Sequence, residues 1–297
     1  MKHIGLNILG KLPLRVHHFL ADWLIYPLVY YGVRYRRKLV DKNLRNAFPD
    51  WSQQQRDELR KRFYHRFADL IVETIYGYSI SDAEIRERMT YEHEDMVAQA
   101  CLEHGGAITM LAHLGTWEWA ADFGRRYAAQ GVVECNVYRR LKNRYFNQLM
   151  LDIRAQRGGE CIEKDVLLRR MIQLRNSKIN AMYGMLADQK PSPRNAHVWT
   201  TFLNQDTAFL NGSEVLGQKF GFPCFYAYIS SPRRGFYHMK LIPLQSEHVT
   251  EEYARLLEQN ILEQPHLWLW THNRWKFQRP NSQIVNNQIV NPKCSVV

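Results

Sequence analysis

Two periodicities of hydrophobic residues divide the chain into a helical first third and an alternating remainder. Between residues 41 and 104, apolar positions such as Phe63 and Phe67 recur at helical spacing, which predicts helices in this part of the chain. Two capping-box patterns, at Ser52–Gln55 and Ser81–Glu84, mark where helices begin. In such a pattern the serine hydroxyl and the later polar side chain satisfy free backbone N–H groups.

From Gly106 onward, short apolar runs alternate with amphipathic stretches. The runs predict strands at 107–112, 132–138, 180–187, 222–229 and 236–242, and the stretches predict helices at 117–130, 145–157, 166–175, 207–220 and 251–262. A polar loop with two prolines is predicted at 190–206, and loops of that length are uncommon unless they are functional. Strands that alternate with helices are typical of a layered α/β domain, so we predict a mixed sheet with flanking helices.

The N-terminal segment has the composition of a membrane-interface helix. Residues 12–33 are rich in Leu, Val, Trp and Tyr but also contain Arg15, Asp22, two histidines and two prolines. A clean membrane span needs about 20 mostly apolar residues, and the uninterrupted part is shorter. The basic cluster at 34–38 follows directly. We therefore expect a membrane-associated helix that spans marginally or lies in the surface. A buried amphipathic helix is the alternative.

The charge balance narrows the choice of partners. The chain has a formal net charge of +11, which favours an acidic partner such as nucleic acid, an anionic membrane or an acidic protein. No helix-turn-helix, zinc-finger or aromatic RNA-binding signature is present, so we expect no nucleic-acid partner. The five cysteines are scattered, without CxxC or zinc-type spacing, and this pattern is typical of a reduced compartment.

The most informative stretch is AITMLAHLGTWEWAADF at 107–123. A strand leads into a tight turn, and the turn leads into a helix. His113 follows the strand, Gly115 permits the turn, Thr116 is positioned to cap the helix, and Glu118 lies in its first turn. Ligands of α/β folds bind at the carboxyl ends of strands. The turn folds back, so we expect His113 and Glu118 to lie side by side.

This pair suits proton transfer from a hydroxyl group. A hydroxyl is a poor nucleophile at neutral pH, and an imidazole can accept its proton as the attack begins. A carboxylate on the other ring nitrogen fixes the tautomer and stabilises the imidazolium. Helix N–H groups and a nearby arginine can stabilise an oxyanion. A histidine and an acid at this spacing also occur without function, so a histidine bonded to a loop backbone is the alternative.

The segment HLGTWEW at 113–119 resembles the signature of the lipid A biosynthesis acyltransferases, which is a histidine, four residues and then an acid. Further blocks resemble that family in the same order: RYRRKLVDKNLRNAF at 34–48, Val137–Arg139 with Asn143, Asp188–Gln189, and WLWTHNRWK at 268–276. The resemblance covers about residues 12–277.

The resemblance implies a glycerolipid-acyltransferase-like fold and transfer of an acyl chain from acyl carrier protein to a hydroxyl of a lipid A precursor. It places the protein at the inner membrane, with its active site on the cytoplasmic face. It implies that His113 is the base, Glu118 its partner and Arg139 a charge stabiliser, with no metal and no cofactor. The implied substrate-binding residues are Asp188, Gln189, Arg140, His272 and Arg274.

Together these patterns divide the chain into an anchoring helix with its basic flank at 1–38, an acyltransferase domain at 39–280 and a polar, flexible tail at 281–297 that contains the near-repeat QIVNN and QIVNP. The loop at 191–206 differs from the glycine-containing loop of the family. A glycerophospholipid or an aminolipid is therefore the alternative acceptor. A metal-dependent hydrolase and a non-catalytic membrane-surface protein are the alternatives from other classes.

Overall fold

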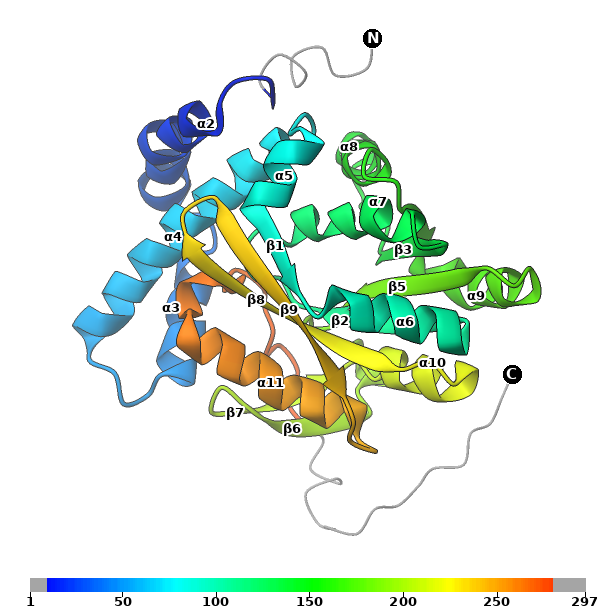
Figure 1. Ribbon diagram of the computed structural model, residues 1–297. Helices are drawn as coiled ribbons and strands as arrows, with labels where there is room; N and C mark the ends of the chain where they lie inside the picture. The colour runs from blue at the N-terminus through cyan, green and yellow to red at the C-terminus, as the bar shows by residue number, and fades with distance from the viewer. Residues whose placement is uncertain (1–9, 280–297) are drawn as a thin grey trace.

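A seven-stranded mixed sheet forms the centre of the molecule (Figure 1), seen in a computed structural model that describes residues 10–279. The strand order is β1-β9-β8-β2-β5-β3-β4, and every neighbouring pair is parallel except β8 and β9. The strands are β1 (Met89–Glu92), β2 (Gly106–Leu111), β3 (Val132–Tyr138), β4 (Glu160–Glu163), β5 (Asn180–Leu186), β8 (Cys224–Arg233) and β9 (Phe236–Leu244).

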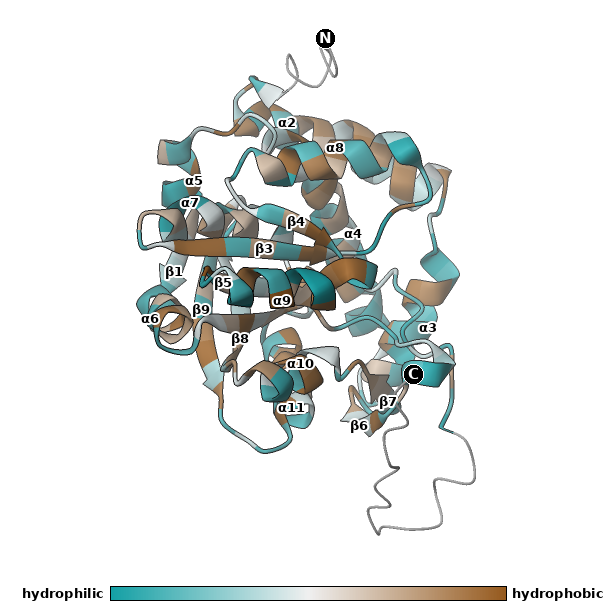
Figure 2. Cartoon of the chain, turned by 90° about the vertical axis from the view of Figure 1, so that its right-hand side faces the viewer, coloured by the Kyte–Doolittle hydropathy of each residue, from teal (hydrophilic) through white to brown (hydrophobic). Residues whose placement is uncertain are grey.

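Helices cover the sheet closely enough to bury its central strand β2 along its whole length. Such a strand reads as a continuous apolar run because both faces are covered. The helices are α2 (Leu14–Leu20), α3 (Arg37–Ala47), α4 (Gln53–Tyr76), α5 (Asp82–Arg88), α6 (Glu94–His104), α7 (Phe123–Ala128), α8 (Arg144–Ala155), α9 (Leu167–Asn176), α10 (Gly212–Phe220) and α11 (Val249–Glu263). Figure 2 shows the brown, hydrophobic segments of β3, with α8 above the strand and α9 below it in this view. The predicted α/β layering is confirmed.

The structure differs from the sequence-based prediction at short elements. The four-residue strands β1 and β4 were not predicted, because each lies at an edge of the sheet and is too short to show a period. The predicted loop at 190–206 contains β6 (Val198–Phe202), which pairs with β7 (Gln205–Phe209) as a separate hairpin. The helix expected from residue 207 begins only at Gly212. The tail at 281–297, with its two QIVN repeats, lies outside the described residues.

The N-terminal segment packs on α4 with one face and leaves the other face bare. It consists of α2 and two short π-helical turns, η1 (Ala21–Ile25) and η2 (Leu28–Gly32). In the region 10–279, no helix is both long and apolar enough to cross a membrane. The bare face carries Phe19 (59% exposed), Trp23 (74%), Leu24 (57%), Leu28 (51%) and Tyr31 (59%).

The carboxylate of Glu73 in α4 joins several parts of the chain. It is fully buried and accepts hydrogen bonds from His18 Nε2 (3.0 Å), Arg66 Nη2 (2.7 Å), the Tyr237 hydroxyl (2.7 Å) and the Thr116 hydroxyl. Burial acts to raise the pKa of Glu73, but these cationic and hydroxyl donors together hold it well below its usual range. This hub therefore connects α2, α4, β9 and the turn after β2.

Candidate active site

The turn after β2 presents His113 at the carboxyl edge of the sheet. Gly115 adopts φ +56°, and a Cβ at this position would lie 3.0 Å from the ring of Tyr237. A glycine is therefore needed both for its backbone angle and for its lack of a side chain. The backbone N–H of Gly115 donates to the carbonyl of Leu267 at 3.0 Å, and Leu114 forms an isolated bridge with Trp268. The turn is thus held against the C-terminal segment.

The imidazole of His113 is bonded to Asp188. Its Nδ1 lies 2.6 Å from Asp188 Oδ1, and its backbone N–H donates to Oδ2 at 3.1 Å. Asp188 follows β5, which is the parallel neighbour of β2, so the two residues meet because the two strands end at the same edge. An ionised carboxylate on Nδ1 fixes the tautomer in which Nε2 carries the lone pair.

Asp188 is buried and ionised. It is 3% exposed and also accepts the indole N–H of Trp268 at 2.9 Å. Burial acts to raise its pKa, but the His113 charge and hydrogen bonds and the Trp268 indole outweigh burial and lower the pKa to about 2. The second ring nitrogen, Nε2 of His113, faces the side-chain amide of Gln189 at 3.1 Å. The His113 side chain remains 13% exposed, so solvent or substrate can reach it.

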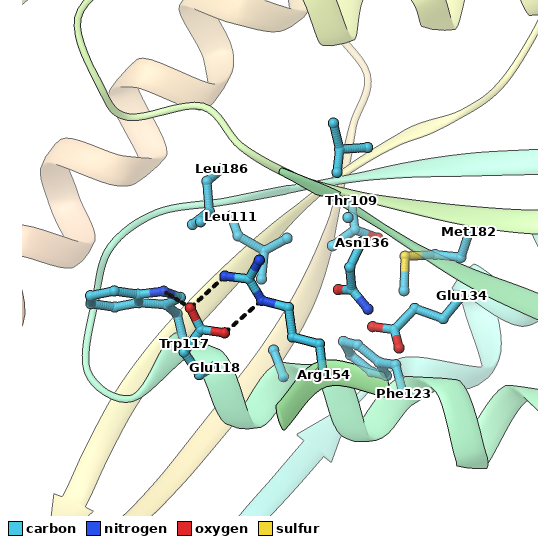
Figure 3. Close-up of a pocket in the computed structure, with 14 residues that line it drawn as sticks. Thr109, Leu111, Trp117, Glu118, Phe123, Glu134, Asn136, Arg154, Met182 and Leu186 are labelled. Carbon is cyan, nitrogen blue, oxygen red and sulfur yellow. Dashed lines mark hydrogen bonds and ion pairs between the residues drawn. The ribbon is translucent and has the colours of Figure 1, made fainter. Parts of the chain in front are cut away.

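The predicted contact between Glu118 and His113 is wrong. Glu118 instead receives two hydrogen bonds from Arg154 of α8, from Nε at 2.8 Å and from Nη2 at 2.7 Å, as Figure 3 shows. A third bond, of 3.0 Å, comes from the Trp117 indole N–H. The Trp117 ring meets the imidazole of His113 edge-on, with 4.7 Å between centroids. Among the described residues no hydrogen bond joins Glu118 to His113, and the Trp117 side chain contacts both.

Thr116 also differs from its predicted role. Its side chain does not cap the helix, which begins as a 3₁₀ turn at Trp117. The hydroxyl instead donates to Glu73 and accepts from Arg66. A threonine before a helix predicts a cap from local sequence alone, whereas here a buried carboxylate from α4 competes for the hydroxyl.

A small cavity lies beside the Glu118–Arg154 pair (Figure 3). Its volume is about 40 Å³, and its lining is mostly apolar, with Glu134 and Asn136 among the polar exceptions. The Glu134 Oε2 and Asn136 Nδ2 atoms have no hydrogen-bond partner among residues 10–279, and burial raises the pKa of Glu134 well above its usual range. This volume has room for water and is too small for an acyl chain.

The remaining predicted site residues lie in different environments. His272 accepts the backbone N–H of Lys190 at 3.2 Å, and burial lowers its pKa to about 4. Arg274 is 3% exposed, donates to the Ala208 carbonyl at 2.5 Å and lies over the ring of Phe209. It is therefore part of the interior.

Cations gather at the edge of the site. Arg139 and Arg140 are exposed in the segment after β3. The pKa of Lys190 is lowered, first by burial and then by the charges of Lys276, Arg139 and Arg274. The structure thus brings Arg139 into the electrostatic range of the residue that follows Gln189, and this cluster favours an anionic ligand.

Two residues of this site, Arg154 and Trp268, were not predicted to act there. Arg154 is one of several arginines on an amphipathic helix, and no local pattern distinguishes it. The sequence did contain a signal for the Asp188–His113 contact. Both residues follow buried strands, and parallel strands that are neighbours place their carboxyl ends together. Within the described residues, no group of three or more His, Cys, Asp or Glu side chains could hold a metal ion.

In this mixed α/β sheet with flanking helices, a histidine held by a carboxylate lies at the strand ends. Together with the sequence blocks on either side of it, this site defines a protein of the acyltransferase class. The chain belongs to the bacterial lipid A biosynthesis acyltransferase family, whose model matches residues 2–277. The match covers nearly the whole chain and confirms the family inferred from HLGTWEW and the later blocks. A comparison with curated proteins gave no match.

Proposed function

We propose that this protein transfers a fatty acyl chain from acyl carrier protein to a hydroxyl of a lipid A precursor, with His113 as the general base. The observation that carries this proposal is the His113–Asp188 pair, 2.6 Å apart. It leaves Nε2 as the proton acceptor, at a partly exposed position where family membership calls for acyl transfer.

The proposed reaction needs no covalent intermediate on the protein. The acceptor hydroxyl replaces the Gln189 amide at Nε2 of His113 and gives up its proton there while its oxygen attacks the thioester carbonyl. Asp188 stabilises the imidazolium that forms. When the tetrahedral intermediate collapses, the carbon–sulfur bond breaks. The leaving thiolate of the carrier then takes the proton from the His113 imidazolium. Arg139 is the proposed stabiliser of the oxyanion.

The proposed donor, acyl carrier protein, is acidic, and a run of basic residues beside the site is its proposed docking surface. Arg140 and Lys142 are exposed between β3 and α8, and Arg144 is exposed at the start of α8. Opposite charges accelerate encounter, and salt screens them within about 8 Å at physiological ionic strength. Changing Arg140 and Lys142 to Glu is expected to lower kcat/KM for the acyl carrier protein in low salt and to have little effect in high salt. A loss that does not depend on salt would contradict steering.

The proposed location is the cytoplasmic surface of the inner membrane, with the N-terminal segment lying flat in the lipid interface. Its bare apolar face includes Trp23 (74% exposed) and Leu28 (51%). The basic cluster Arg34–Lys38 follows, and each basic residue near an anionic surface contributes about 1 kcal/mol. Changing Trp23 and Leu28 to Glu is expected to release the protein from anionic vesicles. Unchanged binding in high salt would place the attachment elsewhere.

The activity is tested with purified protein, acyl carrier protein loaded with a fatty acid, and a purified lipid A precursor, with mass spectrometry of the products. The expected product gains the mass of one acyl chain, and the His113→Ala variant loses about 10²–10⁴-fold in rate. Parallel reactions with a lysophospholipid and an aminolipid identify the acceptor class. A folded His113→Ala variant that retains wild-type activity would refute the mechanism.

A further inference from the structure

A groove next to the active site is lined by aromatic rings and lysines. It has a volume of about 440 Å³, and Trp199, Trp275, Phe277, Lys42 and Lys276 contribute to its walls. The volume lies in the range of small-molecule sites. None of the described residues that line it is acidic. In the part of the chain that the structure describes, Lys42 and Lys276 form no ion pair, and both are exposed. The Lys276 ammonium lies 5.6 Å from the centroid of the Phe277 ring.

The rings of the groove are held in place by their polar ends. The Trp275 indole N–H donates to the Thr207 hydroxyl at 2.7 Å, and the Trp199 indole N–H donates to the Ala196 carbonyl at 3.1 Å. With their nitrogens bonded, both rings are held in the wall of the groove, and the guanidinium of Arg279 lies 5.7 Å from the centroid of the Trp199 ring. Aromatic ring faces are otherwise apolar. Such faces suit the C–H face of a sugar ring.

Two short connections join the groove to the catalytic histidine. The Trp275 ring lies 5.9 Å from the ring of Trp268, and Trp268 donates to Asp188, the partner of His113. On the other side, the Lys190 ammonium lies over the Phe277 ring at 4.6 Å. Lys190 directly follows Gln189, which contacts Nε2 of His113. On each route a single residue, Trp268 or Lys190, lies between the groove and the residues that contact His113.

We propose that this groove binds the phosphorylated sugar headgroup of the acceptor, with the tryptophans against sugar rings and Lys42 and Lys276 against phosphate. Lysine is a point charge that binds phosphate without a fixed approach angle. This inference rests on the proposed function, because it concerns the acceptor of the same reaction. A neutral glycerolipid acceptor offers neither a sugar ring nor this charge.

The first experiment measures kinetics with a phosphorylated glucosamine disaccharide acceptor and with its dephosphorylated form. Lys42→Glu combined with Lys276→Glu is expected to raise KM for the phosphorylated acceptor at least tenfold, while kcat and the KM for acyl carrier protein stay within twofold. With the dephosphorylated acceptor, the lysine variant and the wild-type protein are expected to have the same KM. Lys219→Glu, an exposed lysine on α10, is the matched charge control and is expected to change nothing.

A second set of variants tests the rings. Trp199→Ala is expected to raise KM for both acceptors, and Trp199→Phe is expected to restore it. Unchanged KM in the lysine variant, an equal effect of Lys219→Glu, or a rise confined to the KM for acyl carrier protein would each overturn the proposal. The last result would assign the groove to the donor.

A binding measurement separates failure of the groove from failure of the proposed function. Calorimetry with the deacylated, phosphorylated disaccharide needs no turnover. Wild-type protein is expected to bind it, and the lysine variant is expected to bind at least tenfold more weakly. Binding without acyl transfer would refute the proposed reaction and keep the groove. Acyl transfer to the lipid A precursor without this binding, and with unchanged KM in the variants, would refute the groove alone.

Discussion

Two carboxylates flank the turn that carries His113, and their partners differ. Asp188 comes from a neighbouring strand and bonds the imidazole directly, at 2.6 Å. Glu118 is five residues from His113 in the sequence, yet its two oxygens bond the guanidinium of Arg154. The difference shows that strand order decides which acid serves the histidine. Glu118, which is nearer to His113 in sequence, instead forms an ion pair that joins α8 to the segment after the turn.

The largest expected effect comes from Asp188→Asn. The amide no longer carries the charge that stabilises the imidazolium, so we expect turnover to fall by roughly 10²–10⁴-fold. Steady-state kinetics should show the loss in kcat, with little change in the KM for either substrate. If kcat changes less than threefold in folded protein, the assignment of Asp188 as the positioning residue is wrong.

For Glu118→Gln, we expect the main effect in stability. The change leaves the Arg154 guanidinium without its charged partner in a buried site, and breaking such a pair costs about 3–5 kcal/mol. Chemical denaturation should show this loss. The double variant Glu118→Gln with Arg154→Met removes both charges and should recover much of the stability. If the double variant is no more stable than Glu118→Gln alone, the pair does not act as a unit.

Acid denaturation should reveal the contribution of the Asp188 carboxylate to stability. The pKa of Asp188 is lowered to about 2 in the folded protein, against about 3.9 for an unperturbed aspartate. A lowered pKa contributes stability that is present above the unfolded value and is lost as the pH falls from about 4 to about 2. This contribution is roughly 2–3 kcal/mol. In the Asp188→Asn variant, denaturation midpoints between pH 4 and pH 2 should change less steeply than in the wild type.

The smallest expected effect is that of Trp268→Phe. It keeps the ring but removes the indole N–H that donates to Asp188 at 2.9 Å. Losing one hydrogen bond to a charged group costs about 1.5–3 kcal/mol at most, and less where the bond to His113 persists. We expect a several-fold fall in kcat and a pKa of Asp188 closer to its usual value, measured by NMR titration. A larger fall than that of Asp188→Asn would reverse the proposed order of importance.

The local parts of the site could be predicted from the sequence. The apolar run before His113 and the glycine at 115 predict a strand and a turn, because each depends on neighbouring residues only. The partner of His113 could not be predicted in the same way, since it depends on β5 lying next to β2. The hydroxyl of Thr116 was predicted to cap the helix because neighbouring sequence alone does not show a buried acceptor from a distant helix. Its actual acceptor, Glu73, is 43 positions earlier in the chain.

Short edge elements escaped prediction for a different reason. A four-residue strand such as β1 or β4 shows two positions on each face, too few to establish a period. The hairpin β6–β7 lies within a stretch rich in Thr and Asn. Its two strands pair only with each other, apart from the central sheet. Its position against the C-terminal segment forms one wall of the groove, which only the assembled fold reveals.

The buried carboxylate of Glu73 has a consequence for how this sequence can diverge. Its donors come from α2, α4, β9 and the turn beside His113, and an unpaired buried charge is costly. Exchange of Glu73 for a neutral residue would leave Arg66 with the longer ion pair to Asp69, at 3.5 Å, and loss of Arg66 would remove the guanidinium that pairs with Glu73. Related chains should therefore keep these two residues together or replace them together. His18 and Tyr237 are expected to vary in step with them.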